Sequence, residues 1–71
     1  MTNIRLLKSV IDESGMTMVA ISEKSGISRQ TLYNRMDGVG EFTASEIVGL
    51  TRALKLKKSV RDQIFLTSEI N

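Results

Sequence analysis

Residues 16–36 of this 71-residue chain constrain its fold more than any other stretch, because they predict two short helices separated by very few residues. Thr17 can begin the first helix, since its hydroxyl oxygen can accept a hydrogen bond from a free backbone N–H of the first turn. Gly26 can end that helix in the left-handed conformation, and Ser28 can cap the helix that follows. The turn therefore contains only Gly26, Ile27 and Ser28, which is about the length that a helix-turn-helix unit needs.

Each of these two helices is preceded by a hydrophobic residue that has a hydrophobic partner five positions later. The pairs are Met16 with Ile21, and Ile27 with Leu32. They occupy the positions of a hydrophobic staple, a contact that fixes the angle at which the chain enters a helix. Two stapled helices around one glycine turn predict a helix-turn-helix over about residues 17–36.

Length and composition exclude several classes of protein. The 71 residues contain no cysteine and no histidine, so the chain has no disulfide and lacks the commonest metal ligands. We expect one domain over residues 1–71, with one small core, no metal and no cofactor. No apolar run approaches the roughly 18 residues of a membrane span, and no signal-peptide pattern opens the chain. We therefore expect a cytoplasmic protein that does not bind membranes.

Positive charge is concentrated in the last third of the chain, although the net charge is only +2. The basic residues there are Arg52, Lys55, Lys57, Lys58 and Arg61. Acidic residues precede them at Asp37, Glu41 and Glu46. This distribution permits nucleic-acid binding without requiring it.

A helix is also predicted before the helix-turn-helix, from about Ile4 to Ser14. Thr2 or Asn3 can cap its start, and Gly15 can end it in the left-handed conformation. Its apolar residues recur at helical spacing, so one face is expected to be buried and the charged residues to lie outside that face.

The clearest local signal in the sequence lies at residues 42–47. Thr43 and Glu46 have the spacing of a capping box, and Phe42 and Ile47 have the spacing of a hydrophobic staple. The helix that they open is expected to continue to about Leu54.

A second start of this type, from Ser59 to Asp62, predicts a last helix that runs to about Ser68. Its apolar side is formed by Val60, Ile64 and either Phe65 or Leu66. This helix either closes the core or forms a dimer contact. The sequence as a whole predicts an all-α fold, a compact bundle of about five short helices that contains the helix-turn-helix.

The helix at about residues 29–36 has an outward face suited to DNA. Leu32 and Met36 fall together on the helical wheel and are expected to face the core. The opposite side and its borders are formed by Arg29, Gln30, Thr31, Tyr33, Asn34 and Arg35. Glutamine and asparagine amides can bind adenine bidentately, arginine prefers guanine or phosphate, and the tyrosine hydroxyl can reach phosphate. The alternative interpretation is an ordinary solvated helix face.

The helix at about residues 18–25 is expected to turn Ile21 and two small residues, Ser22 and Ser25, inwards, where a second helix can cross closely. Its outward side carries Val19, Ala20 and Glu23. Exposed apolar residues on a short helix can mark a protein contact. Asp12 and Glu13 form a small acidic corner at the end of the preceding helix, which is either a solvated face or part of such a contact.

Residues 17–38 are similar to the helix-turn-helix of the phage repressor and Cro class. The residues that carry this resemblance are Ile21, Ser22 (where the family usually has alanine), Gly26, Ile27 and Leu32. From Ile4 to Leu66 the chain resembles the small Cro-like regulators of temperate phages of Gram-positive bacteria. The resemblance implies a fold like that of lambda repressor. It also implies base- or phosphate-contacting positions at Ser28, Arg29, Gln30, Tyr33 and Asn34.

One departure from the family pattern bears on the partner. The family commonly begins the first helix of the unit with glutamine, followed by acidic or polar residues. This chain has Met18, Val19 and Ala20 there. The exchange removes a polar phosphate contact and adds an apolar surface, which favours a protein partner.

Two functions follow from these patterns. The first is a regulator of a lysogeny switch that binds operator DNA, with a homodimer reading two half-sites. The second is an antirepressor of the same fold that binds the phage repressor and covers its DNA-reading surface. In this chain the residues that would contact the repressor are Asp12, Glu13, Val19, Ala20, Glu23 and Tyr33. Operator binding alone, as in a Cro-like repressor, is the alternative to a protein that does both.

Catalysis is not expected. Without histidine or cysteine the chain has few nucleophile–base pairs, and Asp12 and Glu13 point about 100° apart on a helix. Gly38-Val39-Gly40 lacks the third glycine and the preceding strand of a phosphate-binding loop.

Overall fold

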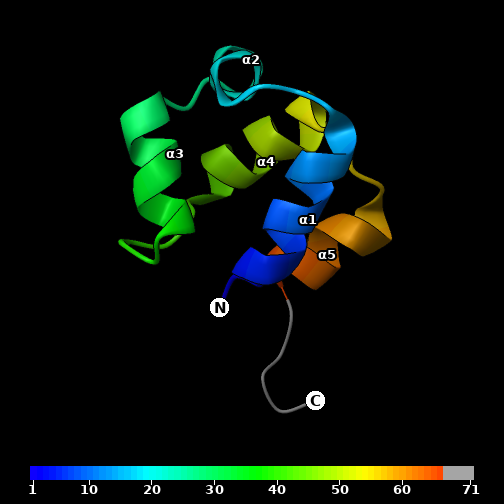
Figure 1. Cartoon of the computed structure of the whole chain (residues 1–71). Helices are drawn as coiled ribbons and strands as arrows, with labels where there is room; N and C mark the ends of the chain where they lie inside the picture. Colours follow the sequence, from blue (N-terminus) through cyan, green and yellow to red (C-terminus); the bar gives the residue numbers. More distant parts are fainter. Residues whose placement is uncertain (67–71) are drawn as a thin grey trace.

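The computed structural model describes residues 1–66, and within them it contains five α-helices and no strand. The helices are α1 (Ile4–Ser14), α2 (Met18–Ser25), α3 (Arg29–Met36), α4 (Ala44–Ala53) and α5 (Lys58–Phe65). Helix α4 runs through the middle of the molecule, with α3 on one side of it and α1 and α5 on the other (Figure 1). The all-α bundle predicted from the sequence is confirmed. Among these helices none has the length and apolar character needed to cross a membrane.

The first three helices begin and end at the residues predicted from their capping signals. Asn3, rather than Thr2, caps α1 by accepting a hydrogen bond from the Leu6 N–H at 3.0 Å. Thr17 accepts from the Ala20 N–H at 3.1 Å to cap α2. Gly26, with a φ of 79°, ends α2 in the left-handed conformation that glycine adopts without strain.

The start of α4 also agrees with the sequence. The Thr43 hydroxyl accepts from the Glu46 N–H at 3.2 Å, and the Glu46 carboxylate accepts from the Thr43 N–H at 3.0 Å. Both bonds of the predicted capping box are therefore present. The helix ends at Ala53, one residue before the predicted Leu54, which is its C-cap.

The predicted start of the last helix is wrong. Helix α5 begins at Lys58, its N-cap is Lys57, and no side chain caps it. Ser59 lies inside the helix, and the Asp62 carboxylate accepts a hydrogen bond from Arg61 instead of completing a capping box. The Ser-x-x-acid pattern at Ser59 and Asp62 therefore does not form a capping box.

The end of α5 also differs from the prediction. The helix ends at Phe65, and the predicted end near Ser68 lies outside the described residues. Ile64 and Phe65 are buried, whereas Leu66 is 67% exposed, so Phe65 completes the apolar side. Within residues 1–66, α5 thus closes the core.

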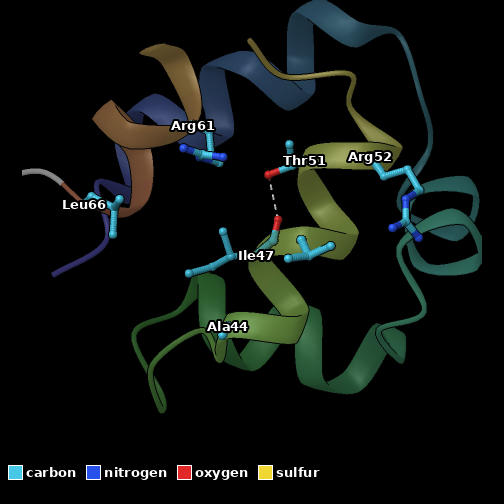
Figure 2. Close-up of a pocket in the computed structure, with 7 residues that line it drawn as sticks. Ala44, Ile47, Thr51, Arg52, Arg61 and Leu66 are labelled. Carbon is cyan, nitrogen blue, oxygen red and sulfur yellow. Dashed lines mark hydrogen bonds between the residues drawn. The ribbon is translucent and has the colours of Figure 1, made fainter. Parts of the chain in front are cut away.

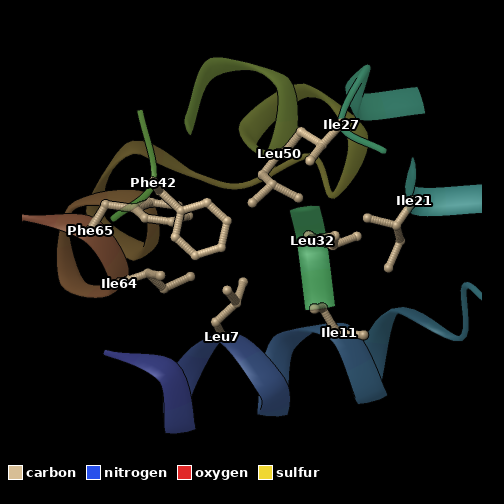
Figure 3. Packing of buried hydrophobic residues seen from close by; sticks show 9 residues of the cluster. All are labelled: Leu7, Ile11, Ile21, Ile27, Leu32, Phe42, Leu50, Ile64 and Phe65. Carbon is tan, nitrogen blue, oxygen red and sulfur yellow. The ribbon is translucent and has the colours of Figure 1, made fainter. Parts of the chain in front are cut away.

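Each helix contributes one completely buried side chain to the centre of the core. These residues are Leu7, Ile21, Leu32, Leu50 and Ile64, one from each of α1 to α5 (Figure 3). The rings of Phe42 and Phe65 meet edge to face, with their centroids 5.4 Å apart, and so attach the loop after α3 to α5. The Asn3 N–H donates to the Ile64 carbonyl at 2.6 Å, which joins the start of α1 to α5.

The closest helix crossing is that of α4 over α2. A Cβ atom at Gly49 would overlap the carbonyl oxygen of Ser25 and lie 3.4 Å from its Cα atom. The prediction that Ser22 and Ser25 leave room for a close crossing is consistent with this contact. The sequence analysis did not single out Gly49, whose missing side chain makes the approach possible. The crossing fixes the position of α2, and through the short turn that of α3.

Candidate nucleic-acid interface

Helix α3 lies at one edge of the molecule and packs on the core along one side only (Figure 1). Leu32 is completely buried, and Met36 is half-buried against the core. Arg29, Gln30 and Tyr33 are exposed, as the helical wheel predicts for the opposite side. Asn34, which was expected to point away from the core together with Gln30, is half-buried. The geometry therefore presents a polar helix surface to the solvent along the length of α3.

The side-chain amides of Gln30 and Asn34 form a hydrogen bond with each other on this surface. The Gln30 side-chain amide donates to the Asn34 side-chain oxygen at 3.1 Å, across one turn of α3. One further N–H of Gln30, the Gln30 oxygen and the Asn34 amide nitrogen have no partner within residues 1–66. The pair offers donors and acceptors side by side, which is the pattern that reads the edge of adenine in the major groove.

Ser28 and Thr31 lie at the start of α3, where the unpaired backbone N–H groups of the helix favour negative charge. The Ser28 hydroxyl accepts from the Thr31 N–H at 3.2 Å and donates to the Thr31 hydroxyl at 3.0 Å. These bonds fix the first turn of α3 before any ligand arrives, so the side chains of that turn keep one orientation.

Arg35 has a different position from the other predicted DNA-contact residues. Its Nε donates to one oxygen of Glu46 at 3.1 Å, and a second guanidinium nitrogen donates to the other oxygen at 3.4 Å. A third bond, at 3.3 Å, reaches the carbonyl of Val39. The side chain is only 22% exposed. We call Arg35 and Glu46, which join the end of α3 to the start of α4, the α3–α4 ion pair.

The surroundings of the α3–α4 ion pair stabilise its charged form. Burial raises the pKa of Glu46, but the hydrogen bond from the Thr43 N–H and the hydrogen bonds and charge of Arg35 lower it more, so the net pKa is below 4.5. A Cβ atom at Gly40, where φ is +80°, would overlap the Arg35 guanidinium. Glycine at this position therefore makes room for the ion pair.

The residues predicted to contact a protein partner fall into two groups. Asp12 and Tyr33 lie together beside a groove of about 550 Å³ between α1, α2 and α3. The other residues that line this groove are Lys8, Ile11, Gly15, Met16, Thr17, Met18 and Met36. Sequence reasoning missed the groove, because the methionines come from both ends of the helix-turn-helix and meet only in three dimensions.

The remaining candidates do not line this groove. Glu13 is exposed near the end of α1, and Val19, Ala20 and Glu23 lie on α2, where Val19 is 46% exposed. Lys24, an exposed cation in the last turn of α2, was not predicted as a contact. Its signal is a basic residue just before the turn that leads into α3.

A family model described as winged helix-turn-helix DNA-binding matches residues 2–37. The match includes α1, α2 and α3, and its 36 residues are just over half of the 71. The chain therefore belongs to the winged helix-turn-helix DNA-binding family. No curated protein and no solved structure matches it.

The matched region ends at the C-cap of α3, where a loop leads into α4. In the described residues 1–66 no strand follows the matched region, and α4 and α5 complete the core. The protein is a DNA-binding regulator of transcription with a helix-turn-helix domain.

Proposed function

We propose that this protein regulates transcription in the lysogeny switch of a temperate phage, by placing α3 in the major groove of operator DNA. The observation that carries the DNA-reading step is the surface of α3, which exposes amide and basic groups and has no carboxylate from residue 28 to residue 36. The resemblance to the Cro-like regulators supports the phage setting.

The contacts divide between base reading and phosphate binding. Gln30 and Asn34 read base edges, because their paired amides keep free donors and acceptors on the outermost side of α3. Arg29 and Tyr33, which lie one turn apart on one side of this pair, contact guanine or the phosphates. Lys24 adds a cation at the end of α2, the helix that crosses the DNA backbone in helix-turn-helix complexes.

A homodimer would place two copies of α3 about one helical turn of DNA apart, so that the operator contains two half-sites. The five-helix unit described by residues 1–66 exposes α3 on one edge, which leaves the other faces for contacts between copies.

The DNA-reading step can be tested without knowing the operator. Duplexes that bind the protein are selected from a random-sequence library, and their affinities are compared with those of scrambled duplexes. Gln30→Ala and Asn34→Ala should each weaken binding to the selected duplex by about 1–3 kcal/mol and leave scrambled duplexes unaffected. Gln63→Ala, the same change at an exposed position of α5, is the control. Failure to enrich any sequence, or an equal loss in the control, would contradict the proposal.

A second function, antirepression, is favoured by the apolar groups beside α3. The groove between α1, α2 and α3 has three methionines, whose flexible side chains adapt to protein partners. The finer resemblance, to the modulators of repression of lactococcal temperate phages, agrees with this role. We propose that the protein binds the phage repressor and covers the helix with which that repressor reads DNA.

The partner contact combines charge and apolar area. Asp12, Glu13 and Glu23 would pair with the basic side chains of the repressor and guide the encounter. The affinity would come from Val19, Ala20 and Tyr33. Because Tyr33 also lies on the DNA-reading side of α3, DNA and repressor would compete for this protein.

Size-exclusion chromatography of the protein mixed with the repressor tests this second function. A shared peak that the selected DNA duplex dissociates is the expected result. The variant Asp12→Asn should weaken the complex, whereas Asp37→Asn, at another exposed acid, should leave it unchanged. Separate elution at micromolar concentrations would remove the support for antirepression and leave DNA binding as the only function.

A further inference from the structure

A groove of about 580 Å³ lies between α4 and α5, away from the residues assigned to DNA and to the repressor (Figure 2). It is lined by Ala44, Ile47, Val48, Thr51, Arg52, Arg61 and Leu66. Val48 is 53% exposed and Leu66 is 67% exposed, so two large apolar side chains meet the solvent at one place. Apolar side chains gathered in this way often mark a surface that binds another molecule.

The charged side chains that line this groove are both positive. The Thr51 hydroxyl donates to the Ile47 carbonyl of its own helix at 2.7 Å and needs no further partner. Arg61 and Arg52 lie on opposite sides of Thr51 (Figure 2), and none of the described residues that line the groove has a carboxylate. Among the described residues, the Arg61 guanidinium forms an ion pair with the Asp62 carboxylate at 2.8 Å, whereas Arg52 forms no ion pair.

The surrounding segment strengthens the positive potential. Residues 52–61 carry five basic side chains and no acidic one. An arginine beside apolar surface binds carboxylates well, because its planar guanidinium is weakly hydrated and donates two parallel hydrogen bonds. The groove is therefore complementary to a ligand that combines carboxylates with aliphatic groups.

We propose that this groove binds an acidic amphipathic helix of another protein. Aliphatic side chains on one face of that helix would enter between Ile47, Val48 and Leu66. Carboxylates along its edges would pair with Arg52 and Arg61. An apolar channel between two helices accommodates such a helix through anchors spaced three or four residues apart.

Two other occupants fit the groove less well. A second copy of this chain would bring the same arginines face to face, because a two-fold interface pairs a surface with itself, and like charges would repel. A nucleic-acid backbone would neutralise the arginines but would leave Val48 and Leu66 without apolar contact. The groove also lies on α4 and α5, whereas α3 carries the base-reading groups (Figure 1).

The test uses a dye-labelled synthetic peptide of about four helical turns, with leucine at every third or fourth position and glutamate along the flanks. Its binding to the full chain is followed by fluorescence anisotropy, and the contacted residues are mapped by chemical-shift changes. Shifts confined to α4 and α5 are expected. A peptide of identical composition in scrambled order should bind at least about tenfold more weakly, because its leucines do not share one face.

Matched variants separate the apolar contribution from the charge. Val48→Ser should weaken peptide binding about tenfold, while Val39→Ser, the same change at a valine that is 59% exposed in the loop after α3, should have no effect. Arg52→Gln should weaken binding more than Lys57→Gln, which removes the same charge outside the groove. Circular dichroism of each variant shows whether it is folded.

Four results would overturn the proposal. One is no binding of the designed peptide at millimolar concentrations, and another is equal binding of the scrambled peptide. A loss of affinity for duplex DNA in Arg52→Gln, with peptide binding unchanged, would assign the groove to nucleic acid. Self-association that Val48→Ser abolishes would assign it to a second copy of the chain.

Discussion

Arg35 and Glu46 lie eleven positions apart in the sequence but join the end of α3 to the start of α4. The same carboxylate also completes the capping box of α4 through the Thr43 N–H. The Glu46 side chain thus both caps α4 and binds Arg35 of α3. A change at Glu46 is therefore expected to affect both the start of α4 and the position of α3. The Arg35 guanidinium donates to both carboxylate oxygens of Glu46, so the ion pair holds the end of α3 against the start of α4.

Glu46→Gln is expected to lower the free energy of unfolding by about 1 kcal/mol near neutral pH, since it removes a partly buried charged pair. Glutamine still accepts the bond from Thr43, so α4 should keep its start. The pKa of Glu46 is lower in the folded state than its ordinary value of 4.5. The ion pair therefore stabilises the fold above pH 4.5, and this stabilisation is lost as the pH falls through the pKa that Glu46 has in the folded protein.

Urea denaturation of both proteins as a function of pH measures this effect. The difference in stability between wild type and Glu46→Gln should be constant from pH 8 to about pH 5.5 and should shrink below pH 4.5. A difference that grows on acidification would contradict the assigned role of the carboxylate.

At the scale of single elements, the two Ser/Thr-x-x-acid patterns have different outcomes. Thr43 accepts the bond that caps α4, whereas Ser59 lies inside α5 and caps nothing. Thr43→Ala should therefore cost about 1 kcal/mol of stability. Ser59→Ala should change stability by less than about 0.5 kcal/mol. Thermal or urea denaturation compares them, and an equal loss in both variants would mean that α5 is capped as its sequence pattern predicts.

The crossing of α4 over α2 depends on Gly49. Gly49→Ala gains about 1 kcal/mol in helix propensity, but its methyl group overlaps the Ser25 carbonyl, which the backbone cannot easily move. We expect a net loss of about 1–2 kcal/mol, because overpacking of this kind forces helices apart. Ser45→Ala, at an exposed position of the same helix, is the control. A variant at position 49 more stable than wild type would contradict this close contact.

The elements that could be predicted from the sequence are those with local signals. Thr17, Gly26 and Ser28 define the helix-turn-helix because caps act within one turn of the chain. The positions of Gln30 and Asn34 on the side of α3 opposite Leu32 follow from the fixed rotation of 100° per residue in a helix, although only Gln30 is exposed.

The features that could not be predicted depend on how helices meet. The ion partner of Arg35 is set by the path of the loop between α3 and α4. The approach at Gly49 and the groove that contains Met16 and Met36 depend on helix crossing angles, which the periodicity of one helix does not determine. The start of α5 at Lys58 has no side-chain cap, so no local signal in the sequence marks it.

At the scale of the whole molecule, basic residues lie both in the helix-turn-helix and near the start of α5. Lys24 and Arg29 belong to the helix-turn-helix, whereas Lys57 lies just before α5, away from α3 (Figure 1). Each cation that contacts a phosphate releases a counterion, so the affinity for DNA should fall linearly with the logarithm of the salt concentration. We expect this salt dependence to come from the cations of the helix-turn-helix.

Arg29→Gln and Lys24→Gln should each reduce the slope of that salt dependence by about 1. Lys57→Gln, with the same change in net charge, should leave the slope unaltered. Filter binding at several salt concentrations measures it. Equal slopes in all three variants would indicate that DNA is held by overall charge, and the assigned orientation would be wrong.

The central claim is that the outward face of α3 reads base edges, and a change in the selected sequence tests it most directly. Selection from a random duplex library is carried out in parallel with the wild type and with Asn34→Ala. The account predicts that the variant enriches the same motif except for a lost preference at one base pair of each half-site, because the removed amide contacts one base. An unchanged motif, or a motif altered at every position, would contradict the claim.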